Sequence, residues 1–278
     1  MSTLEFTFLL WGASFFAGLL GALTGLGGGA ILVPLLTLVF KVDIHYSMGA
    51  SLVSVIATSS GAAAAYVKEG YTNIRIGMFL EIATTTGALL GAYLATRTPT
   101  EGLAIIFGVM LLYSAYLSGR RQPEHPENLN PDPIGARLRL NGSYPAQDGA
   151  RHYEVARVPA GFGLMFGAGT LSGLLGIGSG AVKVLALDQA MKLPFKVSTT
   201  TSNFMIGVTA AASAGVYLRR GYIDPALAMP VMLGVLAGSL FGTRVLVRAR
   251  TQMLRRVFAL IIVIMGIELI FNALTGRL

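Results

Sequence analysis

The feature that most constrains this chain is a run of glycines inside an apolar stretch. Residues 6–40 would fit a membrane helix, but Gly25-Leu26-Gly27-Gly28-Gly29 interrupts them. Each glycine in a helix interior costs about 1 kcal/mol relative to alanine, so one helix is expected to end near residue 24 and another to begin near residue 30. Backbone N–H groups between them lack helical partners, so within a membrane they must be buried in protein or face a watery cavity.

The same pattern returns 151 residues later as Gly176-Ile177-Gly178-Ser179-Gly180. Residues on both sides of the two glycine runs repeat at the same offset. The matching pairs are Gly18 and Gly169, Ser47 and Ser198, Ser51 and Ser202, Tyr66 and Tyr217, Gly70-Tyr71 and Gly221-Tyr222, Gly87 and Gly238, Gly91 and Gly242, and Arg97 and Arg248. A shared offset over this length indicates two homologous halves, a plan that recurs among transporters.

The composition is typical of a membrane protein. Hydrophobic residues make up 54% of the 278 positions and charged residues only 12%, against about 25% charged in soluble domains. The mean hydropathy is +0.67. We therefore expect an all-α, multi-pass protein of the plasma (inner) membrane, surrounded by the lipid bilayer. We attribute the net charge of +8 to residues that flank the spans rather than to nucleic-acid binding, and the absence of cysteine excludes thiol chemistry.

Apolar runs separated by polar breaks predict about five helical segments in each half. In the first half we expect them at 4–24, 29–40, 46–67, 74–96 and 102–118. In the second half we expect them at 159–175, 180–192, 197–218, 225–247 and 254–273. The predicted units are a first membrane repeat at 1–118, a charged, proline-containing linker at 119–157, and a second membrane repeat at 158–278.

Two of these segments have further expectations attached. The linker should be aqueous and mobile, with a short turn or strand near 136–140. The 29–40 segment is too short for a bilayer, which needs about 20 residues, so it could be a re-entrant helix.

The distribution of basic residues bears on how the halves are oriented. If each half crosses the membrane an odd number of times, one face carries ten basic residues near the spans and the other carries five. An even number of crossings gives eight against seven. Because cytoplasmic loops are enriched in Lys and Arg, the stronger bias favours halves of inverted topology, with the linker cytoplasmic and both termini outside.

The glycine runs form the predicted substrate site. Backbone N–H groups and the positive end of a helix dipole together favour a bound anion, and glycine leaves room for the anion to approach. The residues concerned are Gly27, Gly28 and Gly29 in the first half, and Gly178, Ser179 and Gly180 in the second. The alternative is that these glycines only allow close helix packing, as in small-xxx-small seams.

Four polar side chains could complete this site. Lys183 lies one turn after the second glycine run in an apolar segment, where exposure to lipid would cost about 2.5–3.5 kcal/mol. It could bind the anion, or it could snorkel or pair with Asp188. Ser51, Ser202 and Asn203 begin the following helices and can donate hydrogen bonds to anion oxygens. For the serines, the alternative is capping or bonding to their own helix.

Glu81 is a carboxylate about a third of the way into the segment 74–96. An ionisable side chain inside a membrane span is by default a functional candidate. Glu81 could therefore carry a proton and couple transport to the proton gradient. The alternative is an interfacial acid that pairs with Arg75 or Lys68.

The pattern Ala17-Gly18-(x)6-Gly25-Leu26-Gly27-Gly28-Gly29-(x)4-Pro34 resembles the opening signature of the TauE/SafE family of sulfite and organosulfonate exporters. The second glycine run and the patterns Tyr66-(x)3-Gly70 and Gly87-(x)3-Gly91 are also similar, so the resemblance covers nearly all of the chain except the linker. It implies a secondary transporter of small sulfur-containing anions such as sulfite or sulfoacetate, often in export, with coupling to the proton gradient. The second run departs from the first at Ser179 and Lys183.

Other motifs do not indicate an enzyme. The glycines lack the strand and acidic residue of a dinucleotide-binding unit, and the lysine and serine of a Walker motif. The sequence holds no HExxH motif or paired histidines, so we expect no catalytic residue, metal or cofactor. The expected partners are a small anion and protons. The alternative is an uptake carrier or channel for another small anion, such as thiosulfate or a carboxylate, and Gly87 and Gly91 could instead form the face of a homodimer.

Overall fold

The computed structural model describes residues 3–24, 28–68, 70–118, 132–146, 149–178, 180–246 and 251–277. These residues are mostly helical. The helices before the linker are α1 (Thr3–Thr24), α2 (Gly29–Pro34), α3 (Ile44–Lys68), α4 (Ile74–Ala95) and α5 (Thr100–Ser118). The helices after the linker are α7 (Val158–Leu175), α8 (Gly180–Leu185), α9 (Phe195–Arg219), α10 (Pro225–Leu246) and α11 (Thr251–Leu274). Each predicted helical segment therefore coincides with an observed helix to within a few residues.

The two short helices that follow the glycine runs are built alike. A π-helical segment continues α2 at Leu35–Val39, and another continues α8 at Ala186–Ala190. Each is followed by a lysine with positive φ, Lys41 at 56° and Lys192 at 59°. These features occupy corresponding positions of the two halves, so the local backbone path is duplicated along with the sequence.

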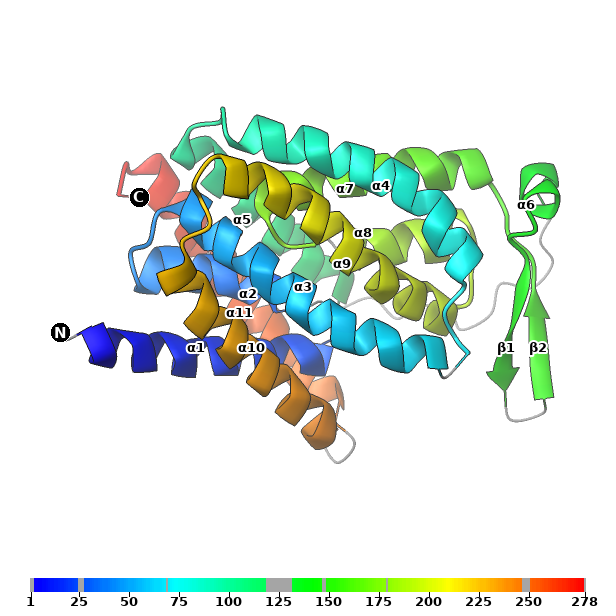
Figure 1. Ribbon diagram of the computed structural model, residues 1–278, viewed down its shortest axis with the longest axis horizontal. Coiled ribbons are helices and arrows are strands. Elements are labelled where there is room, and N and C mark those ends of the chain that lie inside the picture. Colours follow the sequence, from blue (N-terminus) through cyan, green and yellow to red (C-terminus); the bar gives the residue numbers. More distant parts are fainter. Residues whose placement is uncertain are drawn as a thin grey trace.

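The broken helices turn back rather than continue in one direction. In Figure 1, α2 returns beside α1 towards the end of the molecule where the N-terminus lies. The N-terminus and the C-terminus lie at that same end, and the linker elements lie at the opposite end. The chain therefore reverses direction between α1 and the segment 29–40, which is compatible with the re-entrant path considered for this segment.

Helices α3 and α9 run antiparallel at the centre of the molecule (Figure 1). Near the start of α3, a Cβ placed on Gly49 would lie 2.2 Å from the carbonyl oxygen of Tyr222, which follows α9. Beyond the end of α3, the N–H group of Asn73 donates to Thr201 near the start of α9, at 3.0 Å. The start of each helix therefore lies beside the end of the other.

Contacts between the two halves come in reciprocal pairs. A Cβ on Gly87 in α4 would lie 2.2 Å from the carbonyl oxygen of Phe166 in α7. At the corresponding position of the other half, a Cβ on Gly238 in α10 would lie 2.0 Å from the carbonyl oxygen of Phe15 in α1. Small residues let helix backbones touch in this way. Gly87 and Gly91 are therefore used for packing within the chain; a Cβ on Gly91 would lie 2.0 Å from another carbonyl oxygen of α7.

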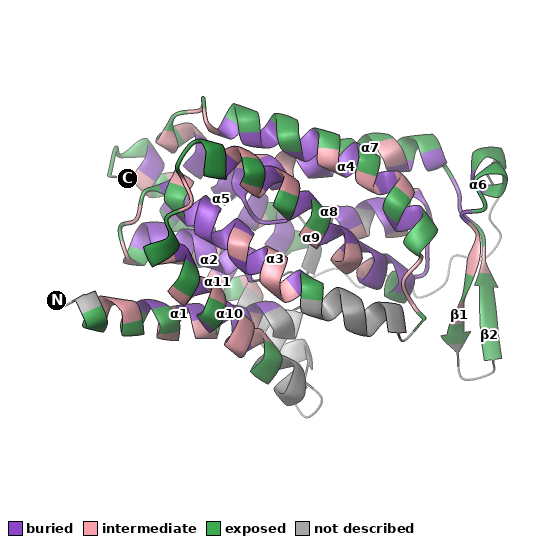
Figure 2. Ribbon diagram, in the orientation of Figure 1, coloured by how far each residue is buried: buried purple, intermediate pink, exposed green. Residues whose placement is uncertain are grey.

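The buried residues gather on the inner helices, and many apolar side chains point outward. Figure 2 shows buried residues concentrated on α2, α3, α8 and α9, with exposed faces on α1, α4 and α10. The outward apolar side chains of α4 include Met78, Ile82 and Leu89, which are 65%, 60% and 44% exposed. An apolar exterior over a packed interior is the arrangement expected in lipid.

Hydropathy of the described residues supports the same interpretation. Three helices are long and apolar enough to cross a membrane, by length and composition: Leu4–Gly21, Ile74–Ala95 and Val158–Leu175. Four shorter apolar helices accompany them, at Gly29–Val39, Thr100–Tyr116, Pro225–Phe241 and Ala259–Leu274. The described residues are thus mostly helical with several apolar helices, which is consistent with the predicted membrane protein, although the fold also contains a short β-hairpin.

The described part of the linker, residues 132–146 and 149–157, is folded and docked. It contains α6 (Pro133–Arg137) and an antiparallel hairpin of β1 (Gly142–Ala146) and β2 (Gly149–Tyr153). The Asn73 amide donates to the carbonyl oxygen of Leu140 at 2.9 Å and to the Tyr153 hydroxyl at 2.7 Å. The prediction placed a short turn or strand near 136–140, but α6 ends there and the strands begin later, at Gly142. Asp132 favours the helix at this place because its carboxylate accepts a hydrogen bond from the N–H group of Ile134 at the helix start.

Candidate functional site

The two glycine bends meet at α3. A Cβ on Gly29, the first residue of α2, would lie 2.8 Å from the Ser51 hydroxyl and 3.3 Å from the Cα atom of Ile177. A Cβ on Gly178 would lie 3.2 Å from Val55 and 2.9 Å from Ile206. The fold thus brings together glycine positions from the two halves of the sequence, and a side chain at either place would have to displace neighbouring side chains.

The start of α2 leaves N–H groups unused. The carbonyl oxygen of Gly28 accepts hydrogen bonds from Ile31 at 3.2 Å and from Leu32 at 3.0 Å, and no side chain caps the helix. Among the described residues, the N–H groups of Gly29 and Ala30 have no hydrogen-bond partner. Gly27 and Ser179, which the sequence also assigns to the site, lie outside the described residues.

Both predicted serines are buried and hold the glycine bends. Ser51 donates to the carbonyl oxygen of Gly176 at 2.8 Å, which links the first half to the second. Ser202 donates to the carbonyl oxygen of Gly180 at 3.3 Å within its own half. A hydroxyl has one hydrogen to donate, so in this arrangement neither serine offers it to an anion.

Asn203 lies beside Ser202 and is partly buried. Its side-chain amide has no hydrogen-bond partner among the described residues, whereas the neighbouring Ser202 hydroxyl is satisfied. An amide carries two donors and an acceptor. Asn203 therefore keeps the hydrogen-bonding capacity that the sequence analysis assigned to it.

Lys183 is completely buried and faces the first half of the chain. Its ammonium donates to the hydroxyl of Thr209 in α9, at 2.5 Å. The Thr209 hydroxyl lies 2.7 Å from Oε1 of Glu81 in α4, to which it donates. Thr85, one turn further along α4, donates to the same Oε1 atom at 3.0 Å. Lys183, Thr209 and Glu81 therefore form a hydrogen-bonded chain that joins three helices, and we call it the buried charge network.

The second carboxylate oxygen of Glu81 is unsatisfied. Oε2 is buried and has no hydrogen-bond partner among the described residues. A buried acceptor without a partner is costly, so native proteins rarely leave one without a reason. This oxygen therefore keeps its capacity to accept a hydrogen bond, as far as the described residues show.

The alternative roles considered for these two charges are not observed among the described residues, which do not include the side chain of Lys68. Within the described part of the chain, neither Lys183 nor Glu81 forms an ion pair, and the ion pair present is His45 with Asp43 at 3.1 Å. Arg75 instead donates to the carbonyl oxygen of Arg139 at 3.3 Å. Lys183 thus neither snorkels to the surface nor pairs with an acid on its own helix.

Aromatic rings and basic groups lie at the two ends of the central helix pair. The His45 ring at the start of α3 stacks on Tyr222, with 4.9 Å between centroids. At the corresponding positions, Nζ of Lys196 lies 4.0 Å from the ring centroid of Tyr71. The hydrogen bond from His45 holds the pKa of the Asp43 carboxyl below its usual range, against an opposing effect of partial burial.

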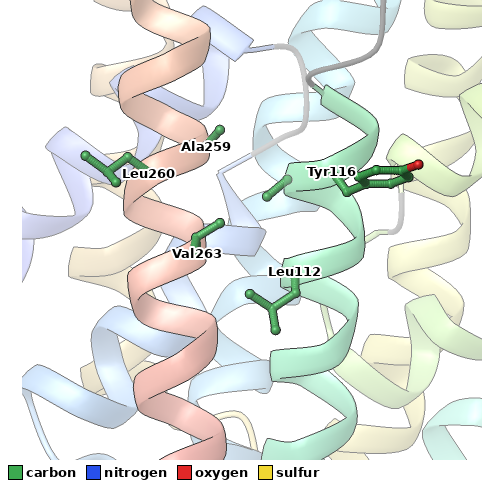
Figure 3. A pocket seen from close by; sticks show the side chains of 6 residues that line it. Leu112, Tyr116, Ala259, Leu260 and Val263 are labelled. Atoms are coloured by element: carbon green, nitrogen blue, oxygen red, sulfur yellow. The ribbon is translucent and has the colours of Figure 1, made fainter.

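A separate apolar depression lies between α5 and α11. Its volume is about 470 Å³, and it is open to the exterior. Its lining residues are Leu112, Ala115, Tyr116, Ala259, Leu260 and Val263 (Figure 3). This lining lacks a charged group, so the depression suits an acyl chain better than an anion and is not part of the candidate site.

Thr209 is the residue of the candidate site that sequence analysis missed. A threonine within a helix commonly bonds to its own backbone, and Thr209 also lies 3.0 Å from the carbonyl oxygen of Met205. The available signal was its place two helical turns after Ser202, on the same face of α9. No group of three His, Cys, Asp or Glu side chains that could hold a metal is present among the described residues.

Comparison with known proteins agrees with this picture of a membrane transporter. Residues 10–269 match the family model described as "Sulfite exporter TauE/SafE". Two proteins named "Probable membrane transporter protein" are similar along nearly their whole lengths. YunE of Bacillus subtilis (strain 168) is 24% identical over 265 residues, covering 93% of this chain and 95% of that one. A protein of Xylella fastidiosa (strain 9a5c) is 28% identical over 265 residues, covering 92% and 93%.

The similarity extends beyond bacteria, whereas no solved structure matches. The "Probable membrane transporter protein MJ0441" of Methanocaldococcus jannaschii is 24% identical over 284 residues, covering 95% of this chain and 97% of that one. The family match spans both glycine runs and the buried charge network. The chain therefore belongs to the TauE/SafE family of membrane transporters.

Proposed function

We propose that this protein is a secondary transporter built from two halves of inverted topology. Reciprocal contacts between the halves support this proposal, because they are what a two-fold operation generates. Helices α3 and α9 occupy corresponding positions and run antiparallel, as they would if the axis of that operation lay across them, in the membrane plane. The repeats at 1–118 and 158–278 would then enter the plasma membrane from opposite faces, with both termini on one side.

The cargo that we propose is a small sulfur-containing anion, such as sulfite, sulfoacetate or a similar organosulfonate. The observation that carries this proposal is the fully buried ammonium of Lys183. This residue lies in α8, the short helix that begins at the second glycine run. A buried charge is stable only with a partner, and an anion near the unused N–H groups of the glycine bends would be a suitable one. The family description supports sulfite as cargo and export as direction.

In this site, the starts of α2 and α8 bind the anion from two sides. Gly27, Gly28 and Gly29 contribute N–H groups from one half, and Gly178, Ser179 and Gly180 from the other. Lys183 supplies the charge and Asn203 supplies amide donors. Ser51 and Ser202 maintain the bends, and a small rotation of either hydroxyl would turn it towards the anion. Rocking of one set of helices against the other would expose the site alternately to each face.

Proton coupling through Glu81 is part of the proposal, since its Oε2 atom has no partner among the described residues. A carrier also fits the packed centre of the molecule, where Ser51 ties the two bends together. The alternative cargoes, thiosulfate or a carboxylate, would use the same positive site. Binding measurements therefore decide between them.

The test is thermal unfolding of the purified protein with sulfite, sulfate, thiosulfate, sulfoacetate, taurine and acetate. A ligand that binds the folded state at 100 times its Kd adds about 2.7 kcal/mol to stability. We expect a rise in Tm with sulfite or sulfonates, lost in Lys183→Leu and kept in Lys196→Leu, since Lys196 is exposed. A rise with thiosulfate or acetate alone would favour the alternative cargo. Unchanged binding by Lys183→Leu would refute the site.

A further inference from the structure

We infer that one proton crosses the membrane together with each singly charged anion, in the same direction, through the buried charge network. This inference rests on the proposed function, because it takes an anion to be the cargo. It adds the sign and the stoichiometry of the coupling, and it assigns a positioning role to Thr209. The starting point is the set of charges that the fold buries together.

The geometry makes Glu81 the counter-charge of Lys183 in the observed arrangement. The Lys183 ammonium contacts the Thr209 hydroxyl at 2.5 Å, and this hydroxyl contacts Oε1 of Glu81 at 2.7 Å. Thr209 separates the two charges, so they attract each other without forming a direct ion pair. Such an attraction is weaker than a contact pair, and an anion that binds Lys183 directly can replace it.

Charge balance then links the anion to a proton. With Lys183 charged and Glu81 ionised, the empty site is neutral. An added anion leaves one uncompensated negative charge in a buried place, which is strongly unfavourable. Neutrality returns when Glu81 takes one proton from the aqueous phase that supplied the anion. Oε2, which has no hydrogen-bond partner among the described residues, is the atom that can accept this proton. Release on the opposite face returns both anion and proton, so Glu81 is ionised again.

Among the described residues packed around Glu81, the other carboxyl is Asp188, which interacts with Lys192 and is not part of the buried charge network. On α4 itself the others are Arg75 and Tyr93, near its two ends, and α7, which packs along α4, carries none between residues 158 and 175. The ionisable residues of α9, of α8 and of the π-helical segment that follows α8 are Lys183, Asp188, Lys196, Tyr217 and Arg219. Lys196 and Arg219 are exposed near opposite ends of α9, and the Tyr217 hydroxyl is bonded to the carbonyl oxygen of Gly173.

The other half of the chain lacks these charges. The residues that correspond to Lys183, Thr209 and Glu81 in the repeat are Leu32, Thr58 and Met232. Among the described residues, Thr58 bonds to carbonyl oxygens of its own helix, at 3.0 and 3.3 Å. One charge network per chain gives one proton per transport cycle, and Thr58 provides a matched control for Thr209.

Movement of proton and anion in one direction has a consequence for the proposed export. A more acidic exterior favours inward movement, so net export requires an outward anion gradient larger than the opposing proton gradient. The cycle carries no net charge when the anion is monovalent, so the membrane potential does not drive it. Both statements can be measured on the wild-type protein.

The experiment uses purified protein in liposomes, with isethionate as a singly charged sulfonate probe and a pH-sensitive dye in the lumen. We expect isethionate entry to acidify the lumen, with an initial rate that is unchanged by a potassium-diffusion potential. A pH difference of one unit should produce an accumulation ratio of about tenfold, as one proton per anion requires. Anion flux with no pH change, or with alkalinisation, would overturn the inference while leaving the proposed transport in place.

Variants then test the residues. Glu81→Gln should remove the response of accumulation to the pH gradient and make net flux depend on the membrane potential. Thr209→Val should lower the accumulation ratio at a given pH difference, whereas Thr58→Val should match the wild type. Persistence of the tenfold ratio in Glu81→Gln would refute the role of this carboxyl. Absence of anion flux from the wild type, for isethionate and for sulfite, would instead refute the proposed function.

Discussion

The packing of the two halves makes a prediction about glycines that can be worked out from the structure. A Cβ on Gly87 would lie 2.2 Å from the carbonyl oxygen of Phe166, and a Cβ on Gly238 would lie 2.0 Å from that of Phe15. Even a weak C–H···O contact keeps carbon and oxygen about 3.3–3.6 Å apart. Alanine at either position must therefore push two helix backbones apart by about 1 Å.

The expected cost follows from two opposing contributions. Alanine favours the helix over glycine by about 1 kcal/mol, which stabilises the variant. Overpacking of a tight contact costs about 1–3 kcal/mol or more, and here the blocking atom belongs to backbone and cannot rotate away. We therefore expect Gly87→Ala and Gly238→Ala to lower the free energy of unfolding by similar amounts, up to about 2 kcal/mol.

Glycines without neighbours provide the control. A Cβ on Gly167 in α7 or on Gly215 in α9 would meet no atom within 4 Å, so alanine there should be neutral or stabilising by up to about 1 kcal/mol. The measurement is the apparent Tm of the purified variants in detergent. The packing argument fails if Gly87→Ala and Gly238→Ala melt at the same temperature as Gly167→Ala and Gly215→Ala.

Three further predictions concern polar groups. Lys183→Leu and Glu81→Met should each destabilise the protein by about 3–5 kcal/mol, but the double variant should recover most of this loss in thermal unfolding; additive losses would contradict the electrostatic link. Ser51→Ala should cost about 1–3 kcal/mol, because it leaves a buried carbonyl oxygen unpaired, and a chemical-unfolding midpoint equal to the wild type would contradict this. The His45 hydrogen bond lowers the pKa of Asp43, so the stability that the ionised Asp43 carboxyl contributes is present above about pH 4 and is lost on acidification below that pH. Asp43→Asn should remove that part of the acid sensitivity, which a pH series of Tm values would reveal.

The helices could be predicted from the sequence because their boundaries have local causes. Glycine runs, prolines and charged breaks end the helices at positions that no tertiary contact overrides. The constant offset between the repeats also identified which positions correspond, and reciprocal contacts such as Gly87 with Phe166 and Gly238 with Phe15 follow that correspondence. Which helix each glycine face would contact could not be predicted, since the sequence does not encode the rotation of one helix against another in a local pattern.

The candidate site was predictable in its charges but not in their connection. Lys183 and Glu81 stand out because ionisable groups are rare in apolar segments. Their link through Thr209 depends on how α4, α8 and α9 meet, and a helical threonine has an ordinary local explanation. The serines show the converse: Ser51 was a plausible anion ligand from its helix start, but the fold places its hydroxyl against a carbonyl oxygen of the other half.

The linker is only partly described, so the prediction that it is mobile applies to residues that lie outside the described ones, 119–131. Its residues 132–146 and 149–157, in contrast, dock through three hydrogen bonds to Asn73 and Arg75 at the start of α4. Burial raises the pKa of the Tyr153 hydroxyl at this contact, although the hydrogen bond from Asn73 opposes the effect. Docking requires a complementary surface, and that surface exists only once α4 and α9 are packed.

Duplication and asymmetry have separate consequences in this fold. The duplicated features, which are the glycine bends, the π-helical segments and the helix crossings, repeat in both halves. The charges of the buried network occur once, because Leu32 and Met232 stand where Lys183 and Glu81 would be repeated. In the proposed transport cycle, reciprocal packing would let the two halves exchange roles during alternating access, whereas a second charged network would bind a second anion and proton. Under this proposal, the apolar pair Leu32 and Met232 limits the carrier to one charged site, which both faces of the membrane would reach in turn.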